Sequence, residues 1–182
     1  RNTSPSQASR VSSLQMSDAT NGTFQSGSLV LNRYLATPTG YASSLPGIIL
    51  CHGFPSGSVD ARQSGYSFSQ LMDRVANDLG WAALTFTFRG CGNSEGDFSM
   101  QGWVDDLRAA IDHLEDEVSP DGVWLVGTNT GGALALCVAA DDPRVRGCAL
   151  LSARADFDDW AGQPRRFFEH AREIGAIRTP GF

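Results

Sequence analysis

Short apolar runs alternate along this chain with segments of helical period, and this alternation is the feature that most restricts its fold. The runs typical of buried strands cover 48–51, 81–88, 123–127 and 147–152. Between them, apolar residues recur every three or four positions, as on one face of a helix. Repeats of strand, helix and strand need crossover connections, which give a parallel sheet covered by helices on both faces. The sequence therefore predicts an α/β protein with a mostly parallel, twisted sheet.

Further elements follow from the same periodicity and from residues that cap helices. Gly80 is expected to end a helix, because glycine readily adopts the left-handed conformation at helix C-termini. Ser99 is expected to accept a backbone hydrogen bond at the start of another helix. The further elements are a strand at 28–36, helices at 68–79 and 103–118, a helix at 131–140 that is apolar on all sides and so buried, and tail helices broken by Pro164.

The composition divides the chain into three parts. Residues 1–15 are serine-rich, polar and aperiodic, which is typical of a disordered leader or a cloning remnant. Residues 16–155 carry the alternating pattern and are predicted to form the core. Residues 156–182 are expected to be a helical segment after the last core strand and the start of a cap.

The charge of the chain excludes several classes of function. Lys and Arg total 14 against 20 Asp and Glu, so the formal net charge is −6. There is no basic run, and neither a nucleic-acid partner nor an anionic membrane surface is expected. All of the basic residues are arginine, which removes Schiff-base chemistry on a lysine amine. No apolar run reaches the roughly 18 residues of a membrane-spanning helix, and no cofactor is expected.

The cysteines indicate free thiols and no metal site. Cys51, Cys91, Cys137 and Cys148 form no Cys-x-x-Cys pair, so neither a zinc site nor a dithiol redox site is expected. Cys51, Cys137 and Cys148 lie inside apolar runs and are predicted to be buried. Free thiols suit a reducing compartment, so a cytoplasmic location is expected.

Three glycine-containing loops follow successive predicted strands. They read His52-Gly53-Phe54-Pro55 after the first, Arg89 to Gly96 after the second, and Gly127-Thr128-Asn129-Thr130-Gly131-Gly132 after the third. Ligands bind beyond the carboxyl ends of parallel strands, where these loops meet. With these loops in this order, residues 27–155 resemble the α/β-hydrolase superfamily, particularly its esterase and acyl-peptidase-like members.

The resemblance implies a carboxyl-ester or amide hydrolase that acts on a small molecule. It places a nucleophile at residue 129, on a sharp strand-to-helix elbow that needs small neighbours. The backbone amides that would stabilise an oxyanion in such a site carry over to Phe54 and Thr130. The residues that would shape the site are His52, Gly53, Arg89, Gly127 and Gly131.

Asn129 departs from the family pattern, which has serine at the centre of Gly-x-Ser-x-Gly. A carboxamide nitrogen is delocalised into its carbonyl group and is a poor nucleophile. Loss of a triad nucleophile costs on the order of 10⁶ in turnover. Three explanations stay open: a natural residue in a protein that lost acyl transfer, an engineered trap, or deamidation to aspartate, which related hydrolases of halides and epoxides place there.

The other members of a catalytic triad have no clear counterpart. In the family, the acid follows a later strand and the histidine lies near the C-terminus of a longer chain, so this chain is expected to be incomplete, with 147–152 as an exposed edge. Asp156 and His170 are the remaining candidates for acid and base. Their simpler roles are a helix N-terminal acid and a surface histidine. His113 is expected to be solvated.

Three functions follow from this sequence. The first is an esterase-lineage protein that is impaired or inactive because of Asn129. The second is a pseudoenzyme that binds a small ester or acyl ligand without catalysis. The third is a dinucleotide-binding domain, because Gly127, Gly131 and Gly132 form a glycine-rich strand-to-helix turn, although the match to Gly-x-Gly-x-x-Gly is poor. The oligomeric state is not predicted.

Overall fold

The computed structural model describes residues 17–41, 44–64 and 68–180, so the predicted leader at 1–15 lies outside the described residues. The strands are β1 (Asp18–Ser26), β2 (Leu29–Thr37), β3 (Gly47–Cys51), β4 (Ala82–Phe86), β5 (Val123–Thr128) and β6 (Val145–Leu151). The helices are α1 (Ser58–Gln63), α2 (Ser69–Arg74) with its π-helical continuation η2 (Val75–Leu79), α3 (Met100–Val118), α4 (Asn129–Asp141), α5 (Asp158–Gly162) and α6 (Pro164–Glu173).

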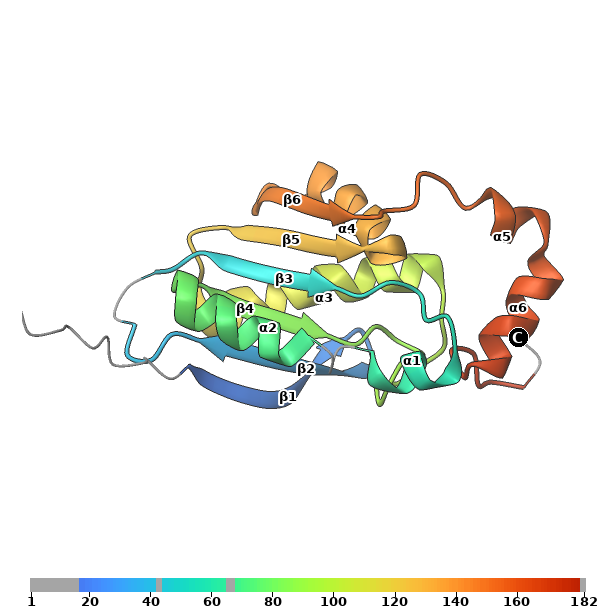
Figure 1. Cartoon of the computed structure of the whole chain (residues 1–182), viewed down its shortest axis with the longest axis horizontal. Coiled ribbons are helices and arrows are strands. Elements are labelled where there is room, and N and C mark those ends of the chain that lie inside the picture. The colour runs from blue at the N-terminus through green and yellow to red at the C-terminus, as the bar shows by residue number, and fades with distance from the viewer. Residues whose placement is uncertain (1–16, 42–43, 65–67, 181–182) are drawn as a thin grey trace, which may run out of the picture.

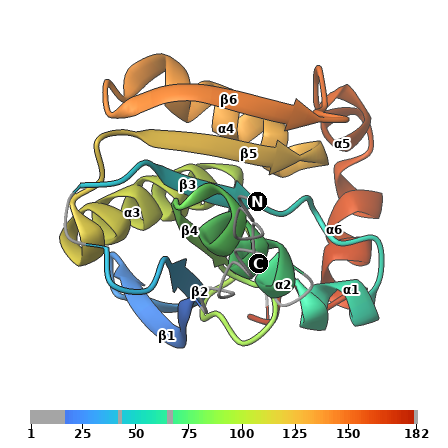
Figure 2. The same cartoon turned by 60° about the vertical axis from the view of Figure 1, so that its left-hand side comes forward.

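The strands form one sheet in the order β1-β2-β4-β3-β5-β6 (Figure 1). The pairs β4–β3, β3–β5 and β5–β6 are parallel, whereas β1–β2 and β2–β4 are antiparallel. The strands turn progressively across the sheet (Figure 2). The predicted α/β class with a mostly parallel, twisted sheet is confirmed, and the loops after β3, β4 and β5 meet at one edge.

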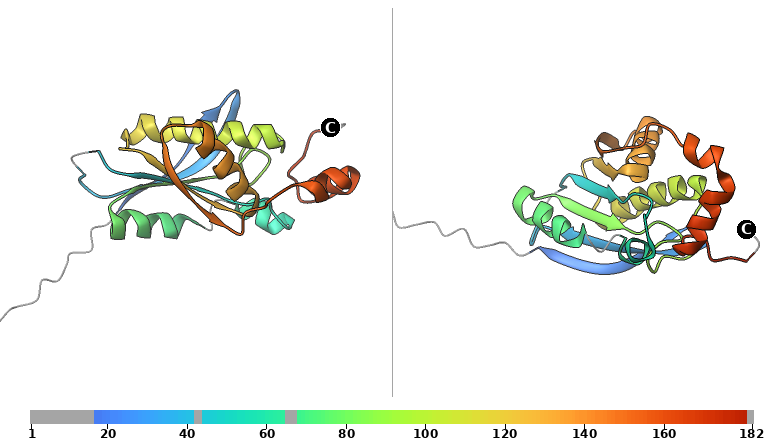
Figure 3. Two further views of the ribbon diagram at one scale, coloured as in Figure 1. Left: turned by 90° about the horizontal axis from the view of Figure 1, so that it is seen from above. Right: turned by 45° about the vertical axis from the view of Figure 1, so that its right-hand side comes forward.

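Helices cover both faces of the sheet, with α3 on one side and α2 on the other (Figure 3). The larger core lies between the sheet and α3 and α4, and Trp103 and Leu107 are fully buried in it. The smaller core lies under α2 and η2 and includes Met72 and Ala76. Every residue of β4 is buried, because a central strand of such a sheet is covered on both faces.

The helix ends confirm two predictions from the sequence. The Ser99 side chain accepts a hydrogen bond from the backbone N–H of Gly102 at 3.0 Å and so opens α3. Gly80 ends η2 with a φ of 71°, in the left-handed region. Pro164 occupies the first turn of α6, directly after α5, as expected for a break between tail helices.

The tail helices lie beyond the carboxyl ends of the parallel strands (Figure 1). The end of α6 and the residues after it are anchored in the larger core, where Ala171, Ala176 and Ile177 are buried. The Ala176 carbonyl accepts a hydrogen bond from the Phe98 N–H at 2.7 Å. The tail is therefore fixed to the loop that precedes α3.

Strand β6 lies at the edge of the sheet, with β5 as its partner in the described part of the chain. Leu150 and Leu151 are 39% and 54% exposed. The expectation of an exposed apolar edge at 147–152 is thus met, whereas the burial predicted from its apolar run is wrong, because most of β6 is exposed.

Several expectations about burial were wrong, and the position of β6 explains most of them. Helix α4 packs beside this edge strand, so one of its sides faces outward and Leu136 is 52% exposed. Cys137 on α4 and Cys148 on β6 are exposed for the same reason. His113 is not simply solvated: its ring stacks on Phe24 at 5.2 Å between ring centroids.

Two elements were absent from the sequence prediction. Strand β1 is mostly polar, and Phe24 and Ser26 are its buried residues. An antiparallel strand at the margin of a sheet needs few apolar residues, so apolar runs do not reveal it. Helix α1 is short and has Gly57 at its N-cap without a side-chain hydrogen bond, so the usual signals of a helix start are missing.

Candidate functional site

Asn129 lies at the tip of a sharp turn between β5 and α4. Its φ is 50°, which is uncommon for a residue with a side chain and marks a locally strained turn. The side chain is exposed. Figure 1 shows this turn at the carboxyl edge of the sheet, facing the tail helices. The backbone N–H of Arg154, in the loop after β6, donates to the Asn129 carbonyl oxygen at 3.3 Å.

The glycines of the turn permit an unusually close approach of backbone segments. A Cβ atom at Gly131 would lie 2.3 Å from the His52 carbonyl oxygen and 2.6 Å from that of Cys51. A Cβ at Gly127 would lie 2.5 Å from the Gly131 carbonyl oxygen. Such distances are too short for any side chain, so these positions require glycine for the strand, the turn and the helix to pack.

The loop after β3 lies directly against this turn. A Cβ atom at Gly53 would be 2.9 Å from the Cβ of Asn129 and 3.1 Å from the Thr128 carbonyl oxygen. The structure therefore brings together residues 52–54 and 129–131, as expected from the sequence for one site.

His52 is buried and is held in one tautomer by two hydrogen bonds. Its Nε2 accepts from the Phe88 N–H at 3.1 Å, so the ring proton is on Nδ1, which donates to the Gly53 carbonyl oxygen at 2.8 Å. Burial lowers the pKa of His52 to about 4, although the hydrogen bond to Gly53 opposes the shift. A neutral ring with both nitrogens occupied shapes the loop and does not act as a base.

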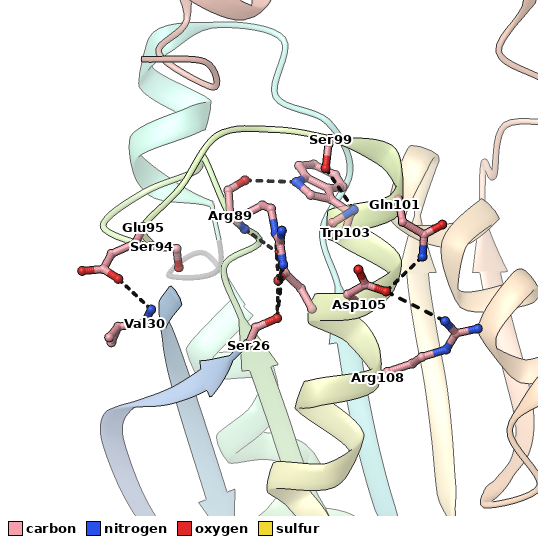
Figure 4. Close-up of polar contacts among 12 residues, drawn as sticks. Ser26, Val30, Arg89, Ser94, Glu95, Ser99, Gln101, Trp103, Asp105 and Arg108 are labelled. Atoms are coloured by element: carbon pink, nitrogen blue, oxygen red, sulfur yellow. Dashed lines mark hydrogen bonds and ion pairs between the residues drawn. The ribbon is translucent and has the colours of Figure 1, made fainter. Parts of the chain in front are cut away.

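Arg89 connects the loop after β4 to α3 and β1. Its Nη2 donates to Oδ1 of Asp106 at 2.7 Å and to the Ser26 hydroxyl at 3.3 Å. Its carbonyl oxygen accepts from the Trp103 indole N–H at 3.0 Å. Figure 4 shows Ser26, Arg89 and Trp103 converging around this contact. Arg89 is therefore a brace for the loop, and it does not reach Asn129 through any hydrogen bond of the described residues.

The first turn of α4 leaves polar groups free. Thr128 is the N-cap, and its side chain forms no capping hydrogen bond. The backbone N–H groups at the start of a helix have no partner within the helix and favour negative charge. The Thr130 hydroxyl is buried and has no hydrogen-bond partner in the part of the chain that the structure describes.

Aromatic side chains surround Phe54, next to Gly53. The Phe54 ring lies 4.9 Å from Phe98, 5.1 Å from Trp160 and 5.4 Å from Phe167, measured between ring centroids. Trp160 belongs to α5 and Phe167 to α6. The tail helices are thus packed against the loop at residues 52–54.

The structure does not join Asp156 and His170 into a catalytic pair. Asp156 is exposed, and its Oδ1 accepts from the Asp158 N–H at 3.2 Å, beside the start of α5. The His170 ring lies 6.4 Å from Phe54 between centroids. Across residues 17–41, 44–64 and 68–180, no hydrogen bond links either residue to the other or to Asn129.

In the same ranges, His, Cys, Asp and Glu nowhere cluster as ligands for a metal ion, and none of the helices is long and apolar enough to cross a membrane.

A family model described as "alpha/beta hydrolase fold" matches residues 46–174 of this chain. These residues include every loop of this site. The chain belongs to the α/β-hydrolase family. Proline iminopeptidase of Lactobacillus delbrueckii subsp. lactis is 26% identical over 140 residues, which are 72% of this chain and 44% of that protein. Quorum-quenching protein AidA of Acinetobacter baumannii is 30% identical over 142 residues, 75% of this chain and 43% of that protein. The chain spans less than half the length of these relatives.

Solved α/β hydrolases share the fold. An α/β serine hydrolase homologue from Coxiella burnetii superposes with a TM-score of 0.62 at 24% identity, over 78% of this chain and 66% of the other. Est1E from Butyrivibrio proteoclasticus, solved with ferulic acid bound, has a TM-score of 0.53 at 23% identity, over 65% of this chain and 47% of the other. The family match over residues 46–174 gives no support to the dinucleotide-binding alternative.

Two features of the site were not predicted from the sequence, namely the partner of Arg89 and the aromatic surroundings of Phe54. A signal for the first was present, because Asp106 lies on the apolar face of α3 between Trp103 and Leu107. A buried acid needs a partner, and Arg89 is the one it has. The contacts of Phe54 with α5 and α6 join residues more than 100 positions apart, and no local pattern indicates them.

Proposed function

We propose that this chain carries the acyl site of a carboxyl-ester or amide hydrolase in which Asn129 blocks acyl transfer. The observation that carries the proposal is the exposed Asn129 carboxamide at a strained, glycine-flanked elbow, where a hydrolase needs a hydroxyl. A carboxamide offers no proton whose removal would create a nucleophile. The protein retains the strand-to-helix turn of an acyl site and lacks a nucleophile at its tip.

The backbone amides of Phe54 and Thr130 are proposed to bind the carbonyl oxygen of the ligand. His52 supports this role, because its Nδ1–H holds the Gly53 carbonyl oxygen. The Gly53–Phe54 peptide is trans, so the Phe54 N–H points to the side opposite that carbonyl. Thr130 lies on the first turn of α4, where free N–H groups and the helix dipole attract negative charge.

Binding of a small ester or acyl compound without turnover is the corresponding activity of the unmodified chain. Names of similar proteins agree with an acyl substrate, since one is a proline iminopeptidase and another is the esterase Pf2001 of Pyrococcus furiosus. The domain arrangement proposed for this function is a core at 16–155 with the segment from 156 onward as the start of a cap. The four free thiols support a cytoplasmic location.

A covalent probe tests the proposal without requiring complete turnover. The unmodified chain, Asn129→Ser and Asn129→Ala are incubated with an alkyl fluorophosphonate, and adducts are measured by intact mass and located by peptide mapping. We expect an adduct at residue 129 in Asn129→Ser and none in the other two proteins. Hydrolysis of p-nitrophenyl acetate is followed in parallel and is expected to be at the background rate for the unmodified chain.

Two results would contradict the proposal. One is ester hydrolysis by the unmodified chain that disappears in Asn129→Ala, because Asn129 would then be competent. The other is a folded Asn129→Ser protein that forms no adduct, because Asn129 would then not be the one group that prevents acyl transfer. Peptide mapping of an aged sample also tests deamidation, which is rejected if residue 129 remains fully amide.

A further inference from the structure

A hollow of about 220 Å³ lies between α5 and α6, outside the contacts described for the elbow. It adjoins the loop of residues 52–54, because its wall residues Trp160 and Phe167 are the ones that contact Phe54. The residues that line it are Asp159, Trp160, Gln163, Arg166, Phe167 and His170.

One wall of the hollow is aromatic. The rings of Trp160 and Phe167 stack with 4.3 Å between centroids and an interplanar angle of 26°. Both side chains are half-buried. The Arg154 guanidinium lies 4.9 Å from the centroid of the Trp160 ring, and Phe167 stacks on that ring, so a ligand reaches the exposed ring edges. Aromatic rings prefer offset-stacked or edge-to-face contacts with other rings, and this wall therefore favours a planar aromatic group.

The charged groups of the hollow leave one cation uncompensated. The Asp159 carboxylate pairs with the Arg154 guanidinium and is neutralised by it. Arg166 donates to the Gln163 side-chain oxygen at 3.4 Å, which is a neutral partner. In the described part of the chain, Arg166 has no carboxylate partner. The N–H groups of an arginine guanidinium that has no carboxylate partner can bind both oxygens of a ligand carboxylate.

We propose that this hollow binds an aromatic carboxylate, with the ring against Trp160 and Phe167 and the carboxylate on Arg166. The inference rests on the proposed function in one respect: the ring belongs to the part of the ester or acyl ligand that lies away from the elbow. His170, at the same hollow, lines the ring site and is not assigned a role as a base.

Binding of 2-naphthoate to the whole chain tests the proposal by isothermal titration calorimetry. Two matched compounds separate the contributions: 2-naphthamide lacks the charge, and decahydro-2-naphthoate lacks the aromatic ring. We expect saturable binding of 2-naphthoate and at least tenfold weaker binding of 2-naphthamide, since hydrogen bonds to charged groups contribute about 1.5–3 kcal/mol and 1.4 kcal/mol corresponds to tenfold. Decahydro-2-naphthoate keeps the carboxylate and is expected to bind several-fold more weakly, because it loses the aromatic contacts.

Neighbouring residues on α6 supply matched control variants. Arg166→Gln is expected to weaken 2-naphthoate binding about tenfold or more, whereas Arg165→Gln leaves it unchanged. Phe167→Leu is expected to weaken binding, whereas Phe168→Leu leaves it unchanged. Thermal unfolding of each variant establishes that it is folded, and the exposure of Arg165 and Arg166 makes a folding defect unexpected at those positions.

The outcomes separate this inference from the proposed function. Absence of saturable 2-naphthoate binding, equal binding of 2-naphthamide, or unchanged binding in Arg166→Gln would overturn the inference. Loss of binding in Asn129→Ala would also overturn it, because the carboxylate would then sit at the elbow. A missing fluorophosphonate adduct in Asn129→Ser contradicts the proposed function alone and leaves the calorimetric result intact.

Discussion

The Arg89 guanidinium forms a salt bridge with the fully buried carboxylate of Asp106, with 2.7 Å between Nη2 and Oδ1. The same carboxylate accepts from the Arg89 backbone N–H at 2.9 Å and from the Ser26 hydroxyl at 2.7 Å. The pair therefore joins the end of β1, the end of β4 and the first half of α3 at a single buried point, beside the loop that supports His52.

Removal of the Asp106 carboxylate is expected to destabilise the protein strongly. Asp106→Ala leaves the Arg89 guanidinium without its counter-ion, and breaking a buried pair in this way costs about 3–5 kcal/mol. Urea unfolding followed by circular dichroism measures the loss. Asp105→Ala is the control, because Asp105 is exposed and 3.9 Å from Arg108, and its cost should stay within about 0.5 kcal/mol. Equal effects of the two substitutions would show that Asp106 has no such role.

The stability of the fold should fall at acidic pH because of His52. The pKa of His52 is lowered to about 4 in the folded protein from 6.5, so below pH 6.5 the unfolded chain binds a proton that the folded chain does not. The free energy of unfolding therefore decreases as the pH falls from 6.5 towards 4, by about 3 kcal/mol in total.

Urea unfolding at pH 7 and at pH 4.5 measures this dependence. His52→Asn should reduce the difference in the free energy of unfolding between the two pH values. Titration of the His52 ring by nuclear magnetic resonance is an independent test that needs no substitution. A His52 resonance that titrates above pH 6 would contradict the buried, neutral ring.

Gly131 is expected to tolerate no side chain. In Gly131→Ala, the new methyl group would meet the His52 and Cys51 carbonyl oxygens at 2.3 and 2.6 Å, and backbone atoms cannot yield as a flexible side chain can. We expect a loss of about 3 kcal/mol or more, or a failure to fold. Gly162→Ala is the control, because a Cβ at Gly162 meets nothing within 4 Å. Thermal unfolding that is unchanged in Gly131→Ala would mean that the elbow is looser than described.

The thiols should divide into two classes of reactivity. Cys137 and Cys148 are exposed, whereas Cys51 and Cys91 are buried. Burial raises the pKa of Cys51 and raises that of Cys91 to about 12, so neither forms an appreciable amount of thiolate at neutral pH. Ellman's reagent should label two thiols of the native protein rapidly and the other two after addition of denaturant. Rapid labelling of all four thiols in the native protein would refute this assignment. So would rapid labelling of the two remaining thiols in the native double variant Cys137→Ser/Cys148→Ser.

The sequence predicted the features that depend on local steric rules. The alternation of apolar runs and helical segments revealed the sheet, and the glycines at 127 and 131 revealed the elbow, because few residue types fit such a turn. The meeting of Gly53 with Asn129 followed from the rule that carboxyl ends of parallel strands share one edge. The roles of Phe54, Thr130 and Asn129 in binding remain predictions.

Features that depend on distant neighbours could not be predicted in this way. Burial of Cys137 and Cys148 depends on what covers β6, and apolar flanking residues carry no information about that. The pairing of Arg89 with Asp106 and the packing of Phe54 against α5 and α6 are set by the tertiary arrangement. Strand β1 was not predicted because it is held mainly by hydrogen bonds to β2 and contributes few apolar residues to the core.

The open outer side of β6 has a practical consequence for the protein in solution. On that side, the backbone N–H and carbonyl groups have no strand partner among the described residues, and Leu150 and Leu151 add apolar surface beside them. Such an edge recruits strands from other polypeptides, a second copy included. Among the described residues, β6 is therefore a strand through which the sheet could be extended by another polypeptide, however well the centre of the sheet is packed.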